Sequence, residues 1–133
     1  MIYFDHLQLS ESILQALSLI KIDYVFQPIF YKDGKTVFAR EALMRPTGTT
    51  VTKLIREYME IGQLHILEIA TFFGAMQAYL LRGYDEIISI NSFPSECFTP
   101  EEGKVFFEYF GDISGQMIVE ILEYPYLSID NYL

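Results

Sequence analysis

Apolar residues recur along the chain at two spacings, one typical of strands and one typical of helices. Residues 10–20 predict a short helix, because Ser10 can cap it and four apolar residues share one face: Ile13, Leu14, Leu17 and Ile20. Residues 23–30 and 36–44 alternate in the manner of strands, and the Asp-Gly pair between them favours a hairpin turn. The first third of the chain therefore predicts a helix followed by a β-hairpin.

The middle of the chain changes to helical spacing. Helices are predicted at 52–61 and 63–82, with Gly62 between them as a helix terminator. Two further strands are predicted at 86–91 and 115–124. The apolar pattern thus gives two helices and then two separated strands.

Between those last two strands lies a segment with every usual signal of a helix start. Thr99 suits the N-cap, Pro100 the first helical position and Glu102 the capping-box position, and Gly111 ends the helix. The predicted order is then β-β-α-α-β-α-β. Strands that alternate with helices after an opening hairpin predict an α/β fold with a parallel sheet or barrel.

Three predicted strands carry an oxygen-bearing side chain near their carboxyl ends: Glu41, Asn91 and Glu120. In a parallel α/β sheet these ends form the functional edge. Two carboxylates and an amide oxygen suit Mg²⁺ or Mn²⁺. A cation there would explain why Glu41 lies in an apolar strand, since an isolated buried carboxylate is unfavourable. The alternative is a Glu41 at the sheet edge, or one paired with Arg40 or Arg45.

Composition narrows the class of protein. The 133 residues are 51% apolar, which predicts a single domain with a core. The net charge of −9 disfavours nucleic acid and anionic membranes as partners. Cys97 is the only cysteine, so no intramolecular disulfide can form, which is consistent with a cytoplasmic protein. No signal peptide and no apolar run long enough to span a bilayer are predicted.

Four ordered segments resemble the EAL domain family: "YVFQPIFYKDGKTVFAREALMRP" (24–46), "GQLHILEIATFFGAMQAYL" (62–80), "ISINSFPSECF" (88–98) and "IVEILEYPYL" (118–127). The first resembles the family's QPI strand and its Glu-Ala-Leu-x-Arg signature. The last departs from the family at Leu122, where threonine is usual. The order and spacing agree from about residue 23 onwards.

The resemblance implies a TIM-like (β/α) barrel whose first strand runs antiparallel to the rest, and hydrolysis of cyclic di-GMP to pGpG with Mg²⁺ or Mn²⁺. It also implies roles for seven residues. The metal ligands would be Glu41, Asn91 and Glu120, with Glu123 close behind them, and the ligand pocket would include Gln27, Leu43 and Arg45. Without the resemblance, the simpler interpretation is that Arg45 forms a surface salt bridge with Glu41 or Glu60. Gln27 would then be a polar residue of an edge strand.

The resemblance covers about half of a barrel, since a complete one needs about 250 residues. We expect a single domain over 1–133, with 1–21 as a helical lead-in and 22–133 as the first half of the barrel. The family's Asp-Asp-Phe-Gly segment, its catalytic lysine and its distal Glu and Gln do not occur in the chain. We therefore expect weak metal binding and no useful turnover, because residues that act as a unit do not contribute additively.

Two alternatives follow for the function. The chain is either an inactive part of a cyclic di-GMP phosphodiesterase, or a non-catalytic module that senses cyclic di-GMP or docks a protein. Exposed apolar sheet edges predict a homo-oligomer in both cases. The sequence from Ser128 to Leu133 has the pattern of a helix that stops after one turn, which suggests a cut domain; an acidic, tyrosine-rich tail is the other interpretation.

Three further residues have a structural and a functional interpretation. Phe93 and Phe98 could stack on a base, although core packing is the simpler role. His65 begins a helix far from any catalytic partner in sequence, so we expect a partly exposed side chain and not a ligand.

Overall fold

The computed structural model describes residues 11–18, 22–93, 95–111 and 114–121, which form helices and one sheet. The elements, in chain order, are α1 (Glu11–Leu17), β1 (Asp23–Phe30), β2 (Val37–Arg45), α2 (Val51–Glu60), α3 (Leu64–Leu81), β3 (Ile87–Ser92), α4 (Pro100–Phe110), a 3-10 turn (Ser114–Gln116) and β4 (Met117–Ile121). The predicted order of elements is confirmed, and the bounds of the first two strands agree to within one residue.

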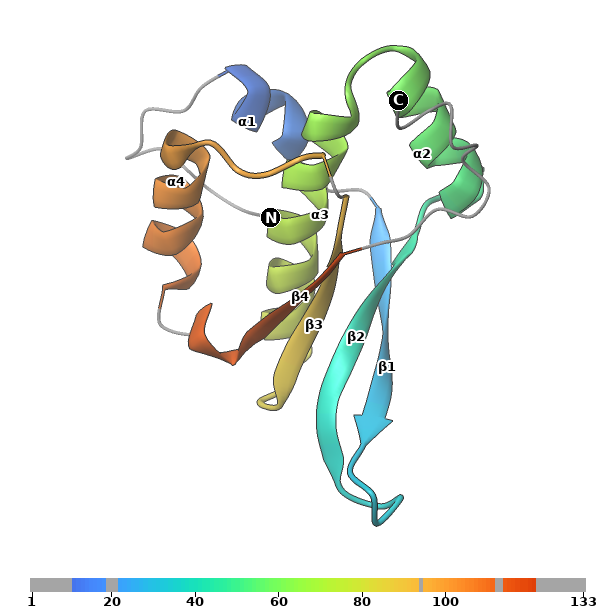
Figure 1. Cartoon of the computed structure of the whole chain (residues 1–133), viewed down its shortest axis with the longest axis vertical. Coiled ribbons are helices and arrows are strands. Elements are labelled where there is room, and N and C mark those ends of the chain that lie inside the picture. Colours follow the sequence, from blue (N-terminus) through green and yellow to red (C-terminus); the bar gives the residue numbers. More distant parts are fainter. Residues whose placement is uncertain (1–10, 19–21, 94, 112–113, 122–133) are drawn as a thin grey trace.

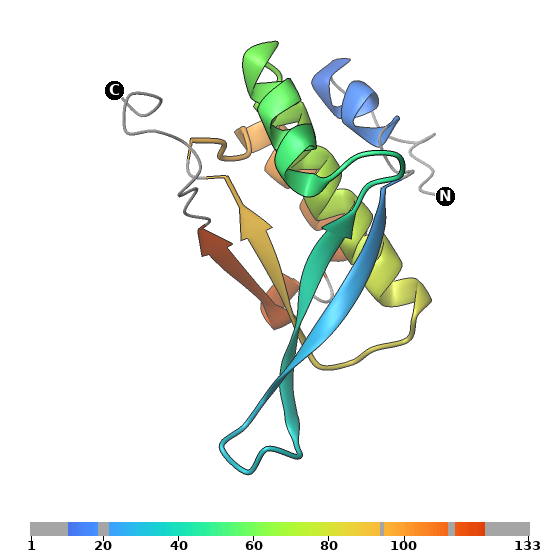
Figure 2. The ribbon, with the colours of Figure 1, turned by 90° about the vertical axis from the view of Figure 1, so that its right-hand side faces the viewer.

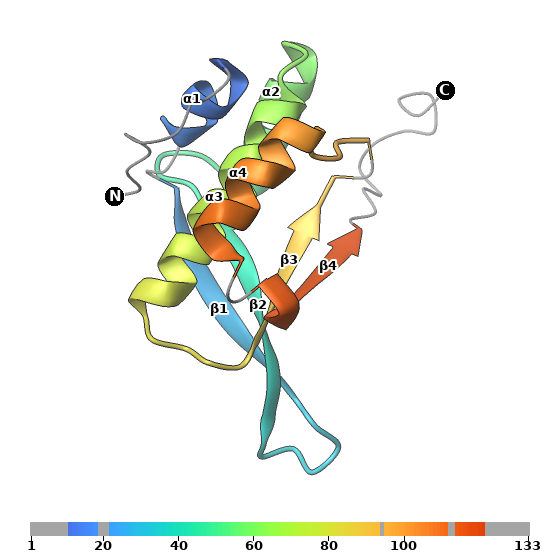
Figure 3. The ribbon, with the colours of Figure 1, turned by 90° about the vertical axis from the view of Figure 1, so that its left-hand side faces the viewer.

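The four strands form one open sheet in the order β1-β2-β3-β4 (Figure 1). β1 runs antiparallel to β2, whereas β2, β3 and β4 are parallel to one another. The connections between the parallel strands pass through α2 with α3 and through α4, and both α3 and α4 lie on the same face of the sheet (Figures 2 and 3). The fold is therefore mixed α/β, with a first strand antiparallel to the others as expected.

Helix α3 is the centre of the core. Its residues from Leu67 to Met76 are all buried, which leaves no solvent-exposed stripe along its middle. Against it pack the helix-facing side chains of the sheet, among them Tyr24, Phe26 and Ile90. On its other side a series of ring contacts joins α3 to α4 through five phenylalanines: Phe72, Phe73, Phe98, Phe106 and Phe110.

The length and composition of α3 correct one expectation. This 18-residue helix is apolar enough to cross a membrane by those two criteria, although no such run was predicted. Most of it is buried within the fold, as in the central helix of many water-soluble proteins. The feature by itself is therefore weak evidence for a membrane.

Local signals account for the ends of the elements. At the hairpin turn Gly34 adopts a φ of 70°, and Asp33 Oδ1 accepts hydrogen bonds from the backbone N–H groups of Lys35 and Thr36. Thr99 Oγ1 accepts from the Glu102 N–H while the Glu102 carboxylate accepts from the Thr99 N–H, which is the predicted capping box. β4 starts two residues later than predicted because a 3-10 turn precedes it.

Candidate functional site

The three oxygen-bearing side chains predicted at the strand ends share one face of the sheet. Glu41 is the register partner of Ser89, and Asn91 is the partner of Glu120. Side chains that face each other across neighbouring strands point the same way, as do side chains two positions apart on one strand. Glu41, Asn91 and Glu120 therefore lie together on the face opposite to α3 and α4.

Hydrogen bonds connect these side chains in two pairs. Asn91 Nδ2 donates to Glu41 Oε2 at 3.2 Å, across β2 and β3. Ser89 Oγ donates to Glu120 Oε1 at 2.6 Å, across β3 and β4. The structure thus brings Glu41 and Asn91 into contact and holds Glu120 at the neighbouring serine, which sequence reasoning did not single out.

The donor set is chemically compatible with a hard divalent cation. Carboxylate and amide oxygens are the ligands that Mg²⁺ and Mn²⁺ prefer. The Asn91 amide would have to turn so that Oδ1 replaces Nδ2 at the cation. The described residues contain no cluster of three or more His, Cys, Asp or Glu side chains placed to hold a metal. A cation at Glu41, Asn91 and Glu120 would therefore take its other ligands from water or from a phosphate.

The expected pocket residues lie on the same face as Glu41. Gln27 is the register partner of Glu41 on β1, and Leu43 and Arg45 follow Glu41 at two-residue steps on β2. Gln27 and Arg45 are exposed, and Leu43 is half-buried. The Arg45 Nη1 atom donates to the backbone oxygen of Met44 at 2.8 Å. The side chains of Gln27, Leu43 and Arg45 therefore lie along the β1–β2 pair and at the end of β2.

Neither arginine neutralises Glu41 within the described part of the chain. Arg40 points to the helix side, where its Nε atom lies 2.8 Å from Glu86 Oε1 and its guanidinium covers the Tyr84 ring. Arg45 makes no salt bridge to Glu41 or Glu60 among the described residues. The interpretation of Glu41 as half of an arginine pair is therefore wrong for this structure.

The other residues that the sequence singled out fall into two groups, those that pack in the core and those outside the described part of the chain. Phe93 is buried beside Ile55 and Leu67, and Phe98 packs among the phenylalanines of α3 and α4, so the core role is confirmed for both. Glu123, proposed close behind the metal ligands, lies outside the described residues, as does the helix start at Ser128.

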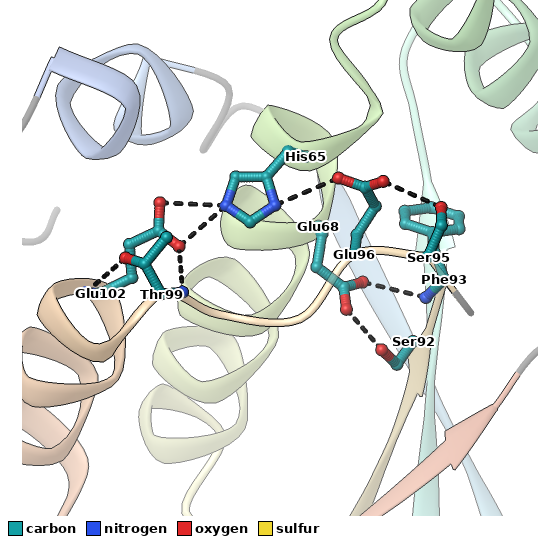
Figure 4. A network of polar contacts seen from close by, with 8 residues as sticks. All are labelled: His65, Glu68, Ser92, Phe93, Ser95, Glu96, Thr99 and Glu102. Carbon is teal, nitrogen blue, oxygen red and sulfur yellow. Dashed lines mark hydrogen bonds and ion pairs between the residues drawn. The ribbon is translucent and has the colours of Figure 1, made fainter.

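A second polar cluster lies where α3 meets the segment that follows β3 (Figure 4). His65 Nδ1 is 3.1 Å from Glu96 Oε1, and His65 Nε2 is 2.8 Å from Glu102 Oε1. The imidazole is 29% exposed, whereas the Glu102 side chain is 3% exposed. His65 is therefore partly exposed, as expected, but it lies between two carboxylates.

Glu68 is the second unexpected feature of this cluster. Its carboxylate is buried on α3 and accepts hydrogen bonds from Ser92 Oγ and, at 3.1 Å, from the Phe93 N–H. Burial raises the pKa of Glu68 to about 7, although the two hydrogen bonds oppose the rise. The end of β3 is thus attached to α3 through a carboxyl group that titrates near neutral pH.

Sequence reasoning missed this cluster, but one signal was present. Glu68 is the only acidic residue in the apolar stretch 64–81, and His65 precedes it by three positions, which places both on one side of a helix. Their partners come from the segment 92–102, and no local pattern identifies that pairing.

Comparison with protein-family models, with curated proteins and with solved structures gave no match for this chain.

Proposed function

We propose that this chain is an EAL-like half-barrel of cyclic di-GMP signalling, with an incomplete site for Mg²⁺ or Mn²⁺ and for cyclic di-GMP. Glu41, Asn91 and Glu120 would hold the cation, and Gln27, Leu43 and Arg45 would contact the dinucleotide. The chain by itself would not turn over substrate. The observation that carries the proposal is the contact between Glu41 and Asn91 on a sheet face shared with Glu120.

The direction of the strands supports the same proposal. One antiparallel strand followed by three parallel strands is the arrangement that the resemblance implies for the beginning of such a barrel. The side chains on the face opposite to the helices would then point into the barrel interior. In the open sheet this face carries the exposed Val25, Ile29 and Ile118.

The chemistry expected of this half is binding. Arg45 presents a planar guanidinium that would donate two hydrogen bonds to phosphate oxygens, and Gln27 offers an amide beside Glu41. A bound cation would screen the carboxylates and polarise a phosphate oxygen. Activation of a water between two ions would need further ligands of the kind that the family's Asp-Asp-Phe-Gly segment and lysine supply. Those residues do not occur in residues 1–133.

The test is Mn²⁺ binding measured by electron paramagnetic resonance, with cyclic di-GMP then added. We expect weak binding by the wild-type chain, a clear loss in Glu41→Gln and in Asn91→Ala, and unchanged binding in Glu108→Gln, which removes an exposed acid on α4. Equal binding by Glu41→Gln and Glu108→Gln would refute the cation site. Sustained pGpG formation would refute the proposal that the chain is catalytically incomplete.

A non-catalytic module that senses cyclic di-GMP or docks a protein is the second candidate. It is favoured by the exposure of Gln27 and Arg45 on the face that carries the cation site. Titration calorimetry separates these roles, because heat on addition of cyclic di-GMP, lost in Arg45→Ala, would favour sensing. Absence of heat together with a defined oligomer would favour protein docking.

The sheet edges are the basis for the proposed homo-oligomer. Within the described residues β1 and β4 each have a strand on one side only, and both carry exposed apolar side chains such as Val25, Val119 and Ile121. Pairing of edges from two copies would cover these groups. Light scattering over a range of concentrations tests this, and a monomer at every concentration would contradict it.

A further inference from the structure

Two side chains of α3 hold both ends of the segment that joins β3 to α4 (Figure 4). Glu68 accepts hydrogen bonds from Ser92 Oγ and from the Phe93 N–H, at the beginning of the segment. His65, one turn earlier on α3, contacts Glu96 within the segment and Glu102 in the first turn of α4. Asn91 directly precedes this segment, so its position depends on how the end of β3 is held.

The contacts of His65 require a particular state of its ring. Both nitrogens lie within hydrogen-bond distance of carboxylate oxygens, at 3.1 Å from Glu96 and at 2.8 and 3.0 Å from Glu102. A neutral imidazole has one N–H donor and one lone pair, whereas the imidazolium has two N–H donors. Only the protonated ring can donate to both carboxylates, and a neutral ring would turn a lone pair towards one of them.

The carboxylates of Glu96 and Glu102 differ in the other hydrogen bonds that they accept. Glu102 also accepts from the Thr99 N–H at 2.8 Å, which fixes it within its own capping box. Glu96 accepts from the exposed Ser95 hydroxyl at 2.8 Å, a contact within the same short loop. Loss of the proton would therefore release Glu96 and its loop more readily than Glu102. The charged groups around His65 in the described structure are Glu96 from the loop, Glu102 from α4 and Glu68 on α3 itself.

We propose that His65, as an imidazolium, is a positioning residue that fastens the segment 92–102 to α3 and thereby keeps Asn91 beside Glu41. The consequence for cation binding rests on the proposed function; the positioning role does not. With the ring protonated the segment is held at both ends, and with the ring neutral the Glu96 contact opens.

The first test uses Glu68→Gln, because this substitution removes the other group of the cluster whose pKa lies near neutral pH. The amide of Glu96 donates to the Phe93 oxygen at 3.0 Å, so its hydrogen exchange reports opening of this loop. We expect its protection factor to fall by about tenfold between about pH 5 and about pH 9, because the neutral ring has only one N–H donor. The side-chain amide signal of Asn91 should move over the same range. A protection factor and an Asn91 signal that are both independent of pH would overturn the proposal.

Two variants separate a positioning role from general stabilisation. Arg at position 65 can donate to two carboxylates at every pH, whereas a glutamine has a single amide group for donation. In the Glu68→Gln background we therefore expect His65→Arg to keep the low-pH protection throughout, and His65→Gln to show the high-pH protection throughout. A chain with both His65→Gln and Glu68→Gln that retains the pH dependence of Glu68→Gln alone would overturn the proposal.

The link to the cation site is tested separately, at one pH, with Mn²⁺ as the probe. We expect Mn²⁺ to broaden the Asn91 side-chain signal at lower concentration in His65→Arg than in His65→Gln. If Mn²⁺ broadens the signal in no form of the protein, the cation site fails, while the exchange data still decide the role of His65. Equal Mn²⁺ response in the two variants would refute the link between them.

Discussion

The side-chain amide of Asn91 donates a hydrogen bond to Glu41 across the parallel pair β2–β3, with 3.2 Å between Nδ2 and Oε2. Asn91→Asp would replace this donor by a second carboxylate. We expect the free energy of unfolding to fall by about 1 kcal/mol at neutral pH, because like charges at this distance repel. Addition of Mn²⁺ should recover the loss. Both effects can be measured by urea denaturation with and without the ion.

The control for that substitution is Gln116→Glu, which adds the same charge at an exposed position of the 3-10 turn. We expect it to change the free energy of unfolding by less than about 0.5 kcal/mol and to give no response to Mn²⁺. An equal Mn²⁺ response in the two variants would show that the ion acts on net charge and not at Glu41 and Asn91.

The raised pKa of Glu68 predicts how the free energy of unfolding depends on pH. Its pKa is raised from the ordinary 4.5 to about 7 in the folded chain, chiefly by burial. The folded state therefore binds this proton more tightly than the unfolded state does. The stability from the protonated group is fully present below about pH 4.5 and is lost as the pH rises through about 7, by roughly 3 kcal/mol. Glu68→Gln should remove this part of the pH dependence.

The measurement is the difference in free energy of unfolding between wild type and variant at several pH values. Glu57→Gln, on an exposed part of α2, serves as the control and should keep the wild-type slope. Parallel curves for wild type and Glu68→Gln across pH 4.5–7 would contradict the raised pKa of Glu68.

Local sequence signals were sufficient for most of the elements. The Thr99 cap with Glu102, and the hairpin turn with Gly34, depend on hydrogen bonds between residues a few positions apart, so the sequence alone predicts them. Alternation in β2 likewise placed Glu41 and Arg40 on opposite faces, as observed. These features need no knowledge of the tertiary structure.

Long-range placement could not be predicted in the same way. The burial of Glu68 and the two partners of His65 arise only when the segment after β3 folds back on α3, 24 to 37 residues away in sequence. The hydrogen bond from Ser89 to Glu120 similarly depends on the register of β3 and β4. The polar residues near the strand ends indicated which side-chain oxygens share an edge of the sheet. Their individual hydrogen bonds depend on the tertiary packing.

Arg40 should be sensitive to replacement by lysine despite the unchanged charge. Its Nε atom donates to Glu86 Oε1 at 2.8 Å while the guanidinium lies 4.1 Å from the Tyr84 ring centroid. Lysine cannot make both contacts with one planar group. We expect Arg40→Lys to lower the free energy of unfolding by about 1 kcal/mol. Arg56→Lys on exposed α2 should have little effect, and equal urea midpoints for the two variants would contradict this role of Arg40.

The stabilisation that involves the Glu86 carboxyl should depend on pH in the opposite sense to that of Glu68. The hydrogen bond from Arg40 is the main cause that lowers the pKa of Glu86 below its ordinary 4.5. A lowered pKa means that the stabilisation is present above pH 4.5 and is lost as the pH falls through the folded value. Arg40→Lys should therefore make the chain less sensitive to acid over that range, as measured by urea denaturation at successive pH values.

Gly74 lies where α3 approaches the buried ring of Tyr24. A Cβ at this position would lie 2.9 Å from Tyr24 Oη and 3.0 Å from Tyr24 Cε2. Alanine normally stabilises a helix by about 1 kcal/mol relative to glycine. Here the overlap with a ring that is 3% exposed should outweigh that gain, since overpacking of a core costs about 1–3 kcal/mol. We expect Gly74→Ala to lower the free energy of unfolding by about 1–2 kcal/mol.

Gly103 on α4 is the matched control, because a Cβ at this position would have no atom within 4 Å apart from its chain neighbours and the backbone of its own helix. Gly103→Ala should raise the free energy of unfolding by up to about 1 kcal/mol. Tyr24→Phe removes the closest atom, so Gly74→Ala should be less harmful in that background, and the two substitutions should not be additive. A Gly74→Ala chain as stable as Gly103→Ala would mean that the Tyr24 ring can shift within the core and that the two residues do not constrain each other.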